Sequence, residues 1–323
     1  MDESKKENSS LTKQSAWILF AKVIGFGLNT LLPLLVVRYL TQEIVGVYRQ
    51  AFMVASNAVL VLPLGFSMSA YYFLNREPEK HRAAVLNILL FNLAMGFLAF
   101  LTLVMFPQIL GATFQSAELS RLAPVIGLLI WVWIFSSFIE TAALALQEAR
   151  FAAGVIILSQ LFKTALMITA VVVFQTVDAL LYATIALFTF QSFFLILYLH
   201  RRFPRFWTSI DLAFFRRQMA YALPFGFSVL LYVGQTDIHN YFVSHSFSAA
   251  EFAIYSVGCF QLPLITLLYE SIGAVMIPKM SILQAGKKKR EMLELTVNAT
   301  KKLAFVYFPL FHLTRTKHRA REQ

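Results

Sequence analysis

The stretch "FAKVIGFGLNTLLPLLVVRYL", residues 20–40, indicates a helix that lies in lipid. It is long enough to cross the ~30 Å hydrocarbon core of a bilayer at a rise of about 1.5 Å per residue. Yet Lys22 and Asn29 lie inside it, and Pro33 interrupts it. A lysine at the centre of a spanning helix costs roughly 2.5–3.5 kcal/mol on insertion scales. We therefore expect these polar side chains to face other helices or water.

The composition of the whole chain agrees with that stretch. Of its 323 residues, 58% are hydrophobic and 14% are charged, whereas soluble proteins carry about 25% charged residues. Continuous apolar windows, without the alternation of barrel strands, predict helices. Eight spans are expected at 16–39, 51–74, 83–106, 123–146, 153–175, 179–199, 221–244 and 252–277, and a ninth begins near 303. The sequence therefore predicts an all-α polytopic membrane protein.

The basic residues are distributed unevenly among the predicted loops. Nineteen Lys and Arg residues lie in the N-terminal tail and in every second loop, whereas the opposite loops and their flanks hold only Arg38, Arg49 and Arg121. Basic loops stay in the cytoplasm, so this pattern predicts a cytoplasmic N-terminus. The net charge of +11 is then explained by the basic residues in the predicted cytoplasmic loops. We expect contact with membrane lipids and no nucleic-acid partner.

An internal similarity suggests how the helices are organised. "LTQEIVGVY" at 40–48 matches "FSAAEFAIY" at 247–255 in a hydroxyl residue at the second position and a final Tyr. The two segments are six predicted helices apart, so a parallel repeat of two six-helix lobes would follow.

We accordingly divide the chain into a 1–14 cytoplasmic tail, a 15–200 first lobe, a 201–217 basic linker, a 218–311 partial second lobe and a 312–323 basic tail. The second lobe would hold helices 7 and 8 and the start of helix 9. We interpret the end as a truncation inside helix 9, and the alternative is a short interfacial helix with a basic end.

Five ionisable residues lie inside predicted spans: Lys22, Glu140, Lys163, Asp237 and Glu270. Facing lipid, they would together cost on the order of 10 kcal/mol or more. Polar residues flank several of them at helical spacing, including Asn29, Gln160 and Tyr232. This pattern predicts a hydrated cavity lined by inward-facing side chains. The alternatives are that Lys22 reaches the headgroups, that it pairs with Glu140, or that these residues make ordinary helix contacts.

Two longer stretches carry a resemblance to a known family. "VVRYLTQEIVGVYRQAF" (36–52) and "PLGFSMSAYYFLNREPEKHRAAVLN" (63–87) resemble the start of bacterial polysaccharide transporters, the lipid-linked oligosaccharide flippases of the O-antigen type. These belong to the multidrug/oligosaccharidyl-lipid/polysaccharide exporter superfamily. The resemblance implies 12 to 14 helices in two lobes, location in the inner membrane, and flipping of a polyprenyl-pyrophosphate-linked oligosaccharide for lipopolysaccharide, capsule or exopolysaccharide synthesis.

The charges in the spans suggest roles for single residues. We expect Lys22 and Lys163 to attract the pyrophosphate, and Asn29, Gln160 and Tyr232 to contact sugar. Glu140, Asp237 and Glu270 are candidates for coupling to H⁺ or Na⁺. The alternatives are a drug/cation antiporter on the same scaffold or a non-functional truncated fragment. An enzyme is not expected, because the sequence has no nucleophile elbow and no phosphate-cradling Gly loop. No cofactor or metal site is predicted.

Overall fold

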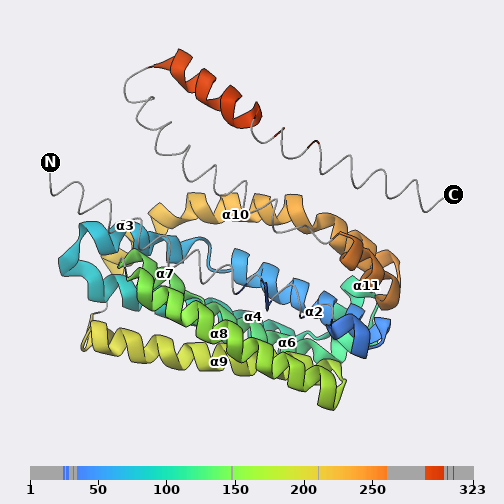
Figure 1. The fold of residues 1–323 in the computed structure, drawn as a ribbon. Coiled ribbons are helices and arrows are strands. Elements are labelled where there is room, and N and C mark those ends of the chain that lie inside the picture. Colours follow the sequence, from blue (N-terminus) through green and yellow to red (C-terminus); the bar gives the residue numbers. More distant parts are fainter. Residues whose placement is uncertain are drawn as a thin grey trace. The chain divides into compact units, whose positions relative to one another are not determined.

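The computed structural model describes residues 25, 27, 28, 32, 35–146, 148–209, 211–259, 288–301, 304 and 308. The chain forms two compact units, Met1–Gly258 and Cys259–Gln323. Every regular element in the described ranges is helical (Figure 1). In the second unit the described residues from 289 to 301, together with 304 and 308, are helical.

The first unit is a bundle of long helices with short turns between them. Its elements are α2 (Gln42–Val61), η1 (Phe66–Met68), α3 (Ser69–Arg76), η2 (Pro78–Lys80), α4 (His81–Met105), α5 (Gln108–Phe114), α6 (Ala117–Ser136), α7 (Phe138–Ala145), α8 (Ala149–Thr169), the π-helical turn η3 (Ala170–Phe174), α9 (Val177–Arg202), η4 (Phe206–Thr208), α10 (Leu212–Ser246) and α11 (Ala249–Gly258). The described residues between 25 and 39 are also helical.

Five of the described helical segments are long and apolar enough to cross a membrane: Gln42–Val61, Pro78–Met105, Ala117–Ala145, Arg150–Phe174 and Val177–Arg202. They correspond to predicted spans 2 to 6, and the all-helical membrane fold is confirmed. The predicted seventh span, 221–244, lies within the 35-residue α10. Much of the first, eighth and ninth spans lies outside the described residues, so the total number of helices stays a prediction.

The observed helices begin and end at different residues from the predicted apolar windows, because capping residues and backbone turns set the helix ends. The second span was expected at 51–74, but α2 begins at Gln42 because the side chain of Thr41 caps it. The chain then breaks at Leu64 and Gly65, which both have positive φ angles, before α3 begins. Likewise α9 continues to Arg202 and Asp211 caps α10, so the connection covers only 203–211, where a basic linker was expected at 201–217.

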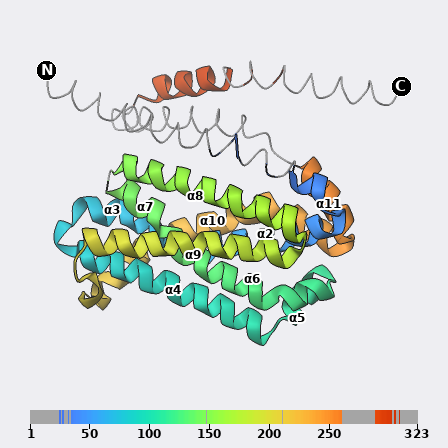
Figure 2. The same cartoon turned by 60° about the horizontal axis from the view of Figure 1, so that its bottom comes forward.

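Helix α6 forms the centre of the first unit, where it packs against α2, α4 and α9 (Figure 2). Its buried face is apolar at helical spacing: Leu119, Leu122, Ile126, Leu129, Ile130 and Ile134. A second apolar cluster surrounds Phe66, Phe138 and Phe214. These clusters hold the polar side chains of neighbouring helices at fixed positions.

The two segments of similar sequence, 40–48 and 247–255, form the same local structure. Thr41 caps α2, and Ser248 caps α11 in a capping box, where its hydroxyl accepts from the Glu251 backbone N–H at 3.3 Å. Helices α2 and α11 pack closely. A Cβ atom at Gly46 would overlap the backbone carbonyl of Ala249. The internal repeat itself stays a prediction.

Candidate functional site

A polar face on α8 lies against the first predicted span. Gln160 and Lys163 are partly buried, and the hydroxyl of Thr164 donates to the Gln160 carbonyl at 2.8 Å. Gly25, a buried residue of the first span, packs beside Gln160, because a Cβ there would lie 3.8 Å from the Gln160 Cγ. The structure therefore places the polar face of α8 beside Gly25 of the first span.

The other predicted site residues lie on different helices. Glu140 is partly buried on α7. On α10, Asp237 is partly buried and accepts a 2.9 Å hydrogen bond from Asn240, whereas Tyr232 is 61% exposed. Helix α8 packs on α7 and α9, while α10 packs on α2, α4 and α5, and Figure 1 shows α2 between α8 and α10. Lys163 and Asp237 are therefore not neighbours in the structure.

Lys22, Asn29 and Glu270 lie outside the described residues. Their proposed contact with substrate or ions stays a prediction. Among the residues that are described, no group of three His, Cys, Asp or Glu side chains could hold a metal ion.

Buried amides, which the sequence reasoning did not single out, tie α10 to the first helices of the unit. Asn87 on α4 donates to the Gln218 side-chain oxygen at 2.9 Å, and Gln218 donates to Ser69 at 3.2 Å. Further along α10, Gln50 donates to the Ser244 hydroxyl at 2.6 Å. The available sequence signal was the presence of single Asn and Gln residues within apolar spans, which require hydrogen-bond partners when buried.

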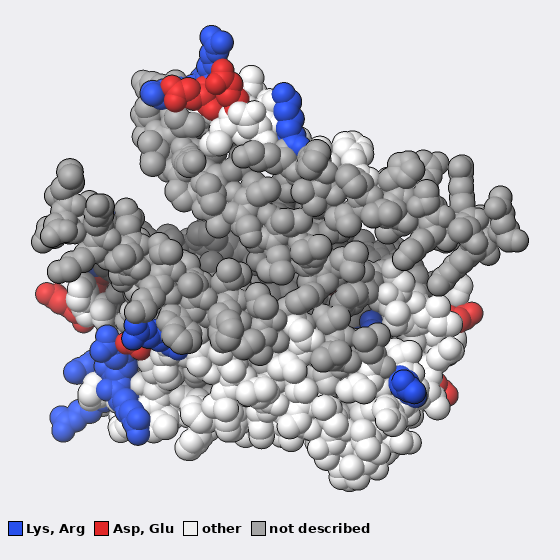
Figure 3. Space-filling view, in the orientation of Figure 1, with Lys and Arg blue, Asp and Glu red and all other residues white. Residues whose placement is uncertain are grey.

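One end of the bundle is strongly basic (Figure 3). We call it the basic end and define it by segments 76–82, 148–150 and 201–217. These contain nine basic and four acidic residues: Arg76, Lys80, Arg82, Arg150, Arg201, Arg202, Arg205, Arg216 and Arg217, with Glu77, Glu79, Glu148 and Asp211. The segments come from three separate loops, so the antiparallel helices bring the predicted cytoplasmic charges together. The distribution expected from the sequence is therefore found in space.

Ion pairs organise part of the basic end. Lys80 pairs with Asp211 at 2.8 Å, and Arg202 pairs with Glu148 at 3.1 Å. A third pair joins Arg217 to Glu77. The hydrogen bond from Lys80, together with that from the Phe214 backbone N–H, holds the pKa of Asp211 below its usual value. Asp211 therefore stays a carboxylate at neutral pH, where it both caps α10 and fixes Lys80.

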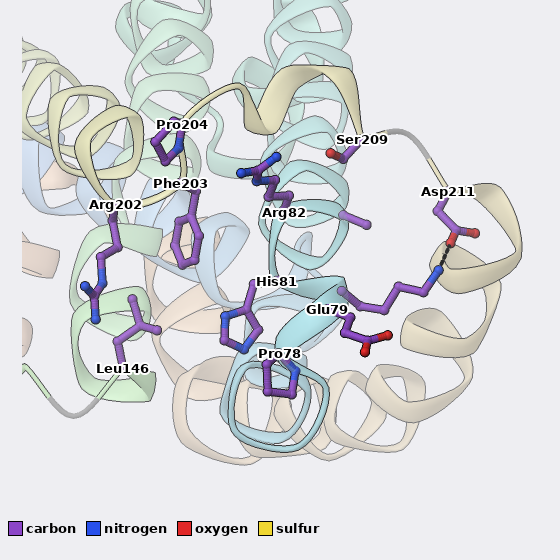
Figure 4. Close-up of a pocket in the computed structure, with 12 residues that line it drawn as sticks. Pro78, Glu79, His81, Arg82, Leu146, Arg202, Phe203, Pro204, Ser209 and Asp211 are labelled. Atoms are coloured by element: carbon purple, nitrogen blue, oxygen red, sulfur yellow. Dashed lines mark hydrogen bonds and ion pairs between the residues drawn. The ribbon is translucent and has the colours of Figure 1, made fainter.

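A pocket of about 660 Å³ opens among these ion pairs (Figure 4). Its wall combines charged groups with apolar side chains: Pro78, Glu79, Lys80, His81, Arg82, Ala83, Leu146, Arg202, Phe203, Pro204, Ser209 and Asp211. The imidazole of His81 packs edge-on against the Phe203 ring. The pocket therefore offers cations beside an apolar surface at the end of the bundle.

The opposite end of the bundle is different in charge. Its described segments 38–43, 106–121, 174–178 and 245–251 contain Arg38 and Arg121, with Glu43, Glu118, Asp178 and Glu251. Arg121 is held between Glu118 and Asp178 at 2.7 and 2.6 Å. A second pocket of about 550 Å³ there contains Glu43, Glu118 and His245 and no Lys or Arg. Of these two ends, the basic end is therefore the one that favours anions.

Solved structures with the same fold are membrane transporters. The chain superposes with a TM-score of 0.62 on a multidrug resistance MATE family transporter of the MOP superfamily in its outward-facing conformation, at 16% identity, covering 93% of this chain and 69% of that one. An inward-facing MATE family structure gives 0.62 at 18% identity, with 86% and 67% covered. A MOP superfamily transporter from Pyrococcus furiosus, described as having a binding pocket of reverse polarity, gives 0.61 at 16%, with 93% and 69% covered.

The fold is thus that of a multi-pass membrane protein of the MOP superfamily type. The sequence narrows the assignment, because residues 11–284 match the model of the family "Polysaccharide biosynthesis protein". The chain belongs to this polysaccharide biosynthesis family, as the stretches at 36–52 and 63–87 predicted. No curated protein matches the chain significantly.

Proposed function

We propose that the protein moves a polyprenyl-pyrophosphate-linked oligosaccharide across the inner membrane, for the synthesis of a cell-surface polysaccharide, by alternating access. The observation that carries the proposal is the partly buried Lys163 within a spanning helix of a chain from the polysaccharide biosynthesis family. The fold, shared with transporters solved in outward-facing and inward-facing conformations, supports the mode of transport.

Lys163 supplies the charge that such a substrate requires. A pyrophosphate cannot cross hydrocarbon unaided, because an isolated buried charge costs tens of kcal/mol by Born solvation. Opposite unit charges about 4 Å apart attract by roughly 4 kcal/mol at an effective dielectric constant of about 20. Gln160, one helical turn from Lys163, presents an amide suited to a sugar hydroxyl. Lys22, Asn29 and Tyr232 extend the proposed contact surface.

The basic end supports a cytoplasmic location for the N-terminus. Its Lys and Arg residues lie on the side that the positive-inside rule assigns to the cytoplasm. The substrate would enter from that side with its lipid tail in the bilayer. No enzymatic step or cofactor is part of the proposal. H⁺ or Na⁺ would supply the driving force through Glu140, Asp237 or Glu270.

A drug/cation antiporter is the second candidate function. The partly buried carboxylates of Glu140 and Asp237 favour it, because carboxylates in a cavity would attract cations. Two of the similar structures are described as a multidrug resistance transporter. The two candidate functions differ in the charge of the substrate. Lys163 would attract an anionic lipid-linked glycan and would repel a cationic drug.

Substitution of Lys163 tests the proposal. The purified protein is placed in vesicles that contain a polyprenyl-diphosphate-linked oligosaccharide, and an impermeant oxidant reports the glycans that reach the outer face. We expect Lys163→Ala to slow translocation at least about tenfold, the equivalent of 1.4 kcal/mol. Lys163→Arg keeps the charge and should retain most activity. Leu161→Ala alters a 52% exposed side chain of the same helix and serves as the control. Translocation by Lys163→Ala at the wild-type rate would exclude the proposed charge role.

A further inference from the structure

The pocket at the basic end contains a guanidinium group that no acidic residue neutralises. Lys80 and Arg202 are held by Asp211 and Glu148. In the part of the chain that the structure describes, Arg82 has neither a carboxylate partner nor a hydrogen bond. Its side chain is exposed and lies between Pro204 and Ser209 in Figure 4. Arg82 is therefore available to an anion from outside the protein.

A second polar group in the pocket also lacks a partner. The Nε2 atom of His81 is buried and makes no hydrogen bond among the described residues. Buried ring nitrogens normally have a partner, so this atom is an unsatisfied polar group next to Arg82 in the sequence. His81 and Arg82 are consecutive at the start of α4. The two unsatisfied groups therefore belong to one rigid element.

We propose that this pocket binds the phosphodiester headgroup of a membrane glycerophospholipid, with Arg82 as the principal contact. Guanidinium groups bind phosphate oxygens through paired, charge-assisted hydrogen bonds. The pocket volume of about 660 Å³ lies within the usual range of roughly 300–1,000 Å³ for small-molecule sites. The pocket also lies at the ends of spanning helices, where the headgroups of a bilayer are found.

The charges of the pocket select a phosphodiester over more highly charged phosphates. Three cations line it, Lys80, Arg82 and Arg202, and two carboxylates, Glu79 and Asp211. Lys80 and Arg202 are already paired with Asp211 and Glu148, so Arg82 is the cation among these three that is left to meet the single negative charge of a phosphodiester. Free phosphate and diphosphate carry more negative charge and would meet the two carboxylates. Leu146, Phe203 and Pro204 provide an apolar wall for the glycerol backbone.

This site is separate from the α8 face that carries the proposed function. None of the residues that line the pocket belongs to α8, and Lys163 is not among them. Binding of a lipid headgroup in this pocket therefore does not depend on which substrate the protein transports.

Native mass spectrometry of the delipidated protein tests the proposal. The probe is dioleoyl phosphatidylglycerol added in detergent, and inorganic phosphate and inorganic diphosphate are added in separate arms. Arg82→Ala should weaken phosphatidylglycerol binding about tenfold, the effect of losing a charge-assisted hydrogen bond. Arg82→Lys should recover part of the affinity. Arg201→Ala removes an exposed cation from the same end without touching the pocket and should bind as the wild type does.

Two results would overturn the proposal. If Arg82→Ala and Arg201→Ala bound phosphatidylglycerol equally well, the lipid would be held by general surface charge. If phosphate or diphosphate bound in an Arg82-dependent manner and displaced the lipid, the site would belong to a soluble anion. Unfolding temperatures measured in parallel would establish that each variant is folded, because Arg82 is exposed and its loss should not affect packing.

Discussion

Substitution of Gly46 by alanine tests the close crossing of α2 and α11. A Cβ atom at position 46 would overlap the carbonyl carbon and oxygen of Ala249. These are backbone atoms in the first turn of α11, so no side-chain rotation can relieve the clash. The two helices must shift apart, and overpacking of this kind costs typically about 1–3 kcal/mol. We expect the unfolding temperature to fall by roughly 2–12 °C, given about 2–4 °C per kcal/mol for domains of this order of size.

Gly154→Ala provides the matched control. Gly154 is exposed on α8, and a Cβ atom there would meet no other atom within 4 Å. The same chemical change in an open helix should leave stability unchanged or raise it by up to about 1 kcal/mol. Thermal unfolding in detergent can be followed by the fluorescence of Trp131 and Trp133 on α6, which packs against α2. The crossing would be refuted if Gly46→Ala unfolded at the wild-type temperature, or if both variants lost equal stability.

Two further variants test the contacts of α10. Asn can replace Asp211 as a helix cap but not as the partner of Lys80. The lowered pKa of Asp211 means that its charge stabilises the fold above about pH 4, and that this contribution is lost as the pH falls through the folded pKa. The unfolding temperatures of the wild type and Asp211→Asn should differ at pH 7 and converge as the pH falls through the lowered folded pKa of Asp211. Gln218→Leu removes the 2.9 Å acceptor of the buried Asn87, which keeps only a 3.4 Å hydrogen bond to the Asp211 carbonyl, and should cost about 1–3 kcal/mol. The double variant with Asn87→Leu should lose less than the sum of the single variants in chemical unfolding.

The helical membrane fold could be predicted because the length of each apolar stretch and the charge of each loop can be read directly from the local sequence. Windows of apolar residues located spans 2 to 6, and the alternation of basic loops matched the basic end of the bundle. The helix ends could not be located from hydropathy, because polar residues set them. Thr41 and Asp211 cap helices outside the apolar windows, and the break at Leu64 and Gly65 depends on backbone angles.

The candidate site was predictable only within single helices. Helical spacing placed Gln160 and Lys163 on one face of α8, and the structure agrees. Spacing cannot reveal which helices are neighbours, so the sequence could not show that α10, which carries Asp237, packs on α2, α4 and α5 and that α8 packs on α7 and α9. The pocket around Arg82 was missed for the same reason. Its charged residues come from two loops, 76–82 and 201–217, that only the folded bundle brings together.

Translocation of a lipid-linked glycan, measured beside transport of a cationic dye in the same vesicles, tests the central claim most directly. We expect vesicles containing the protein to expose the glycan of a polyprenyl-diphosphate-linked oligosaccharide faster than protein-free vesicles do. An H⁺ or Na⁺ gradient should drive no accumulation of the dye. Gradient-driven accumulation of the dye without translocation of the glycan would contradict the account and favour the antiporter.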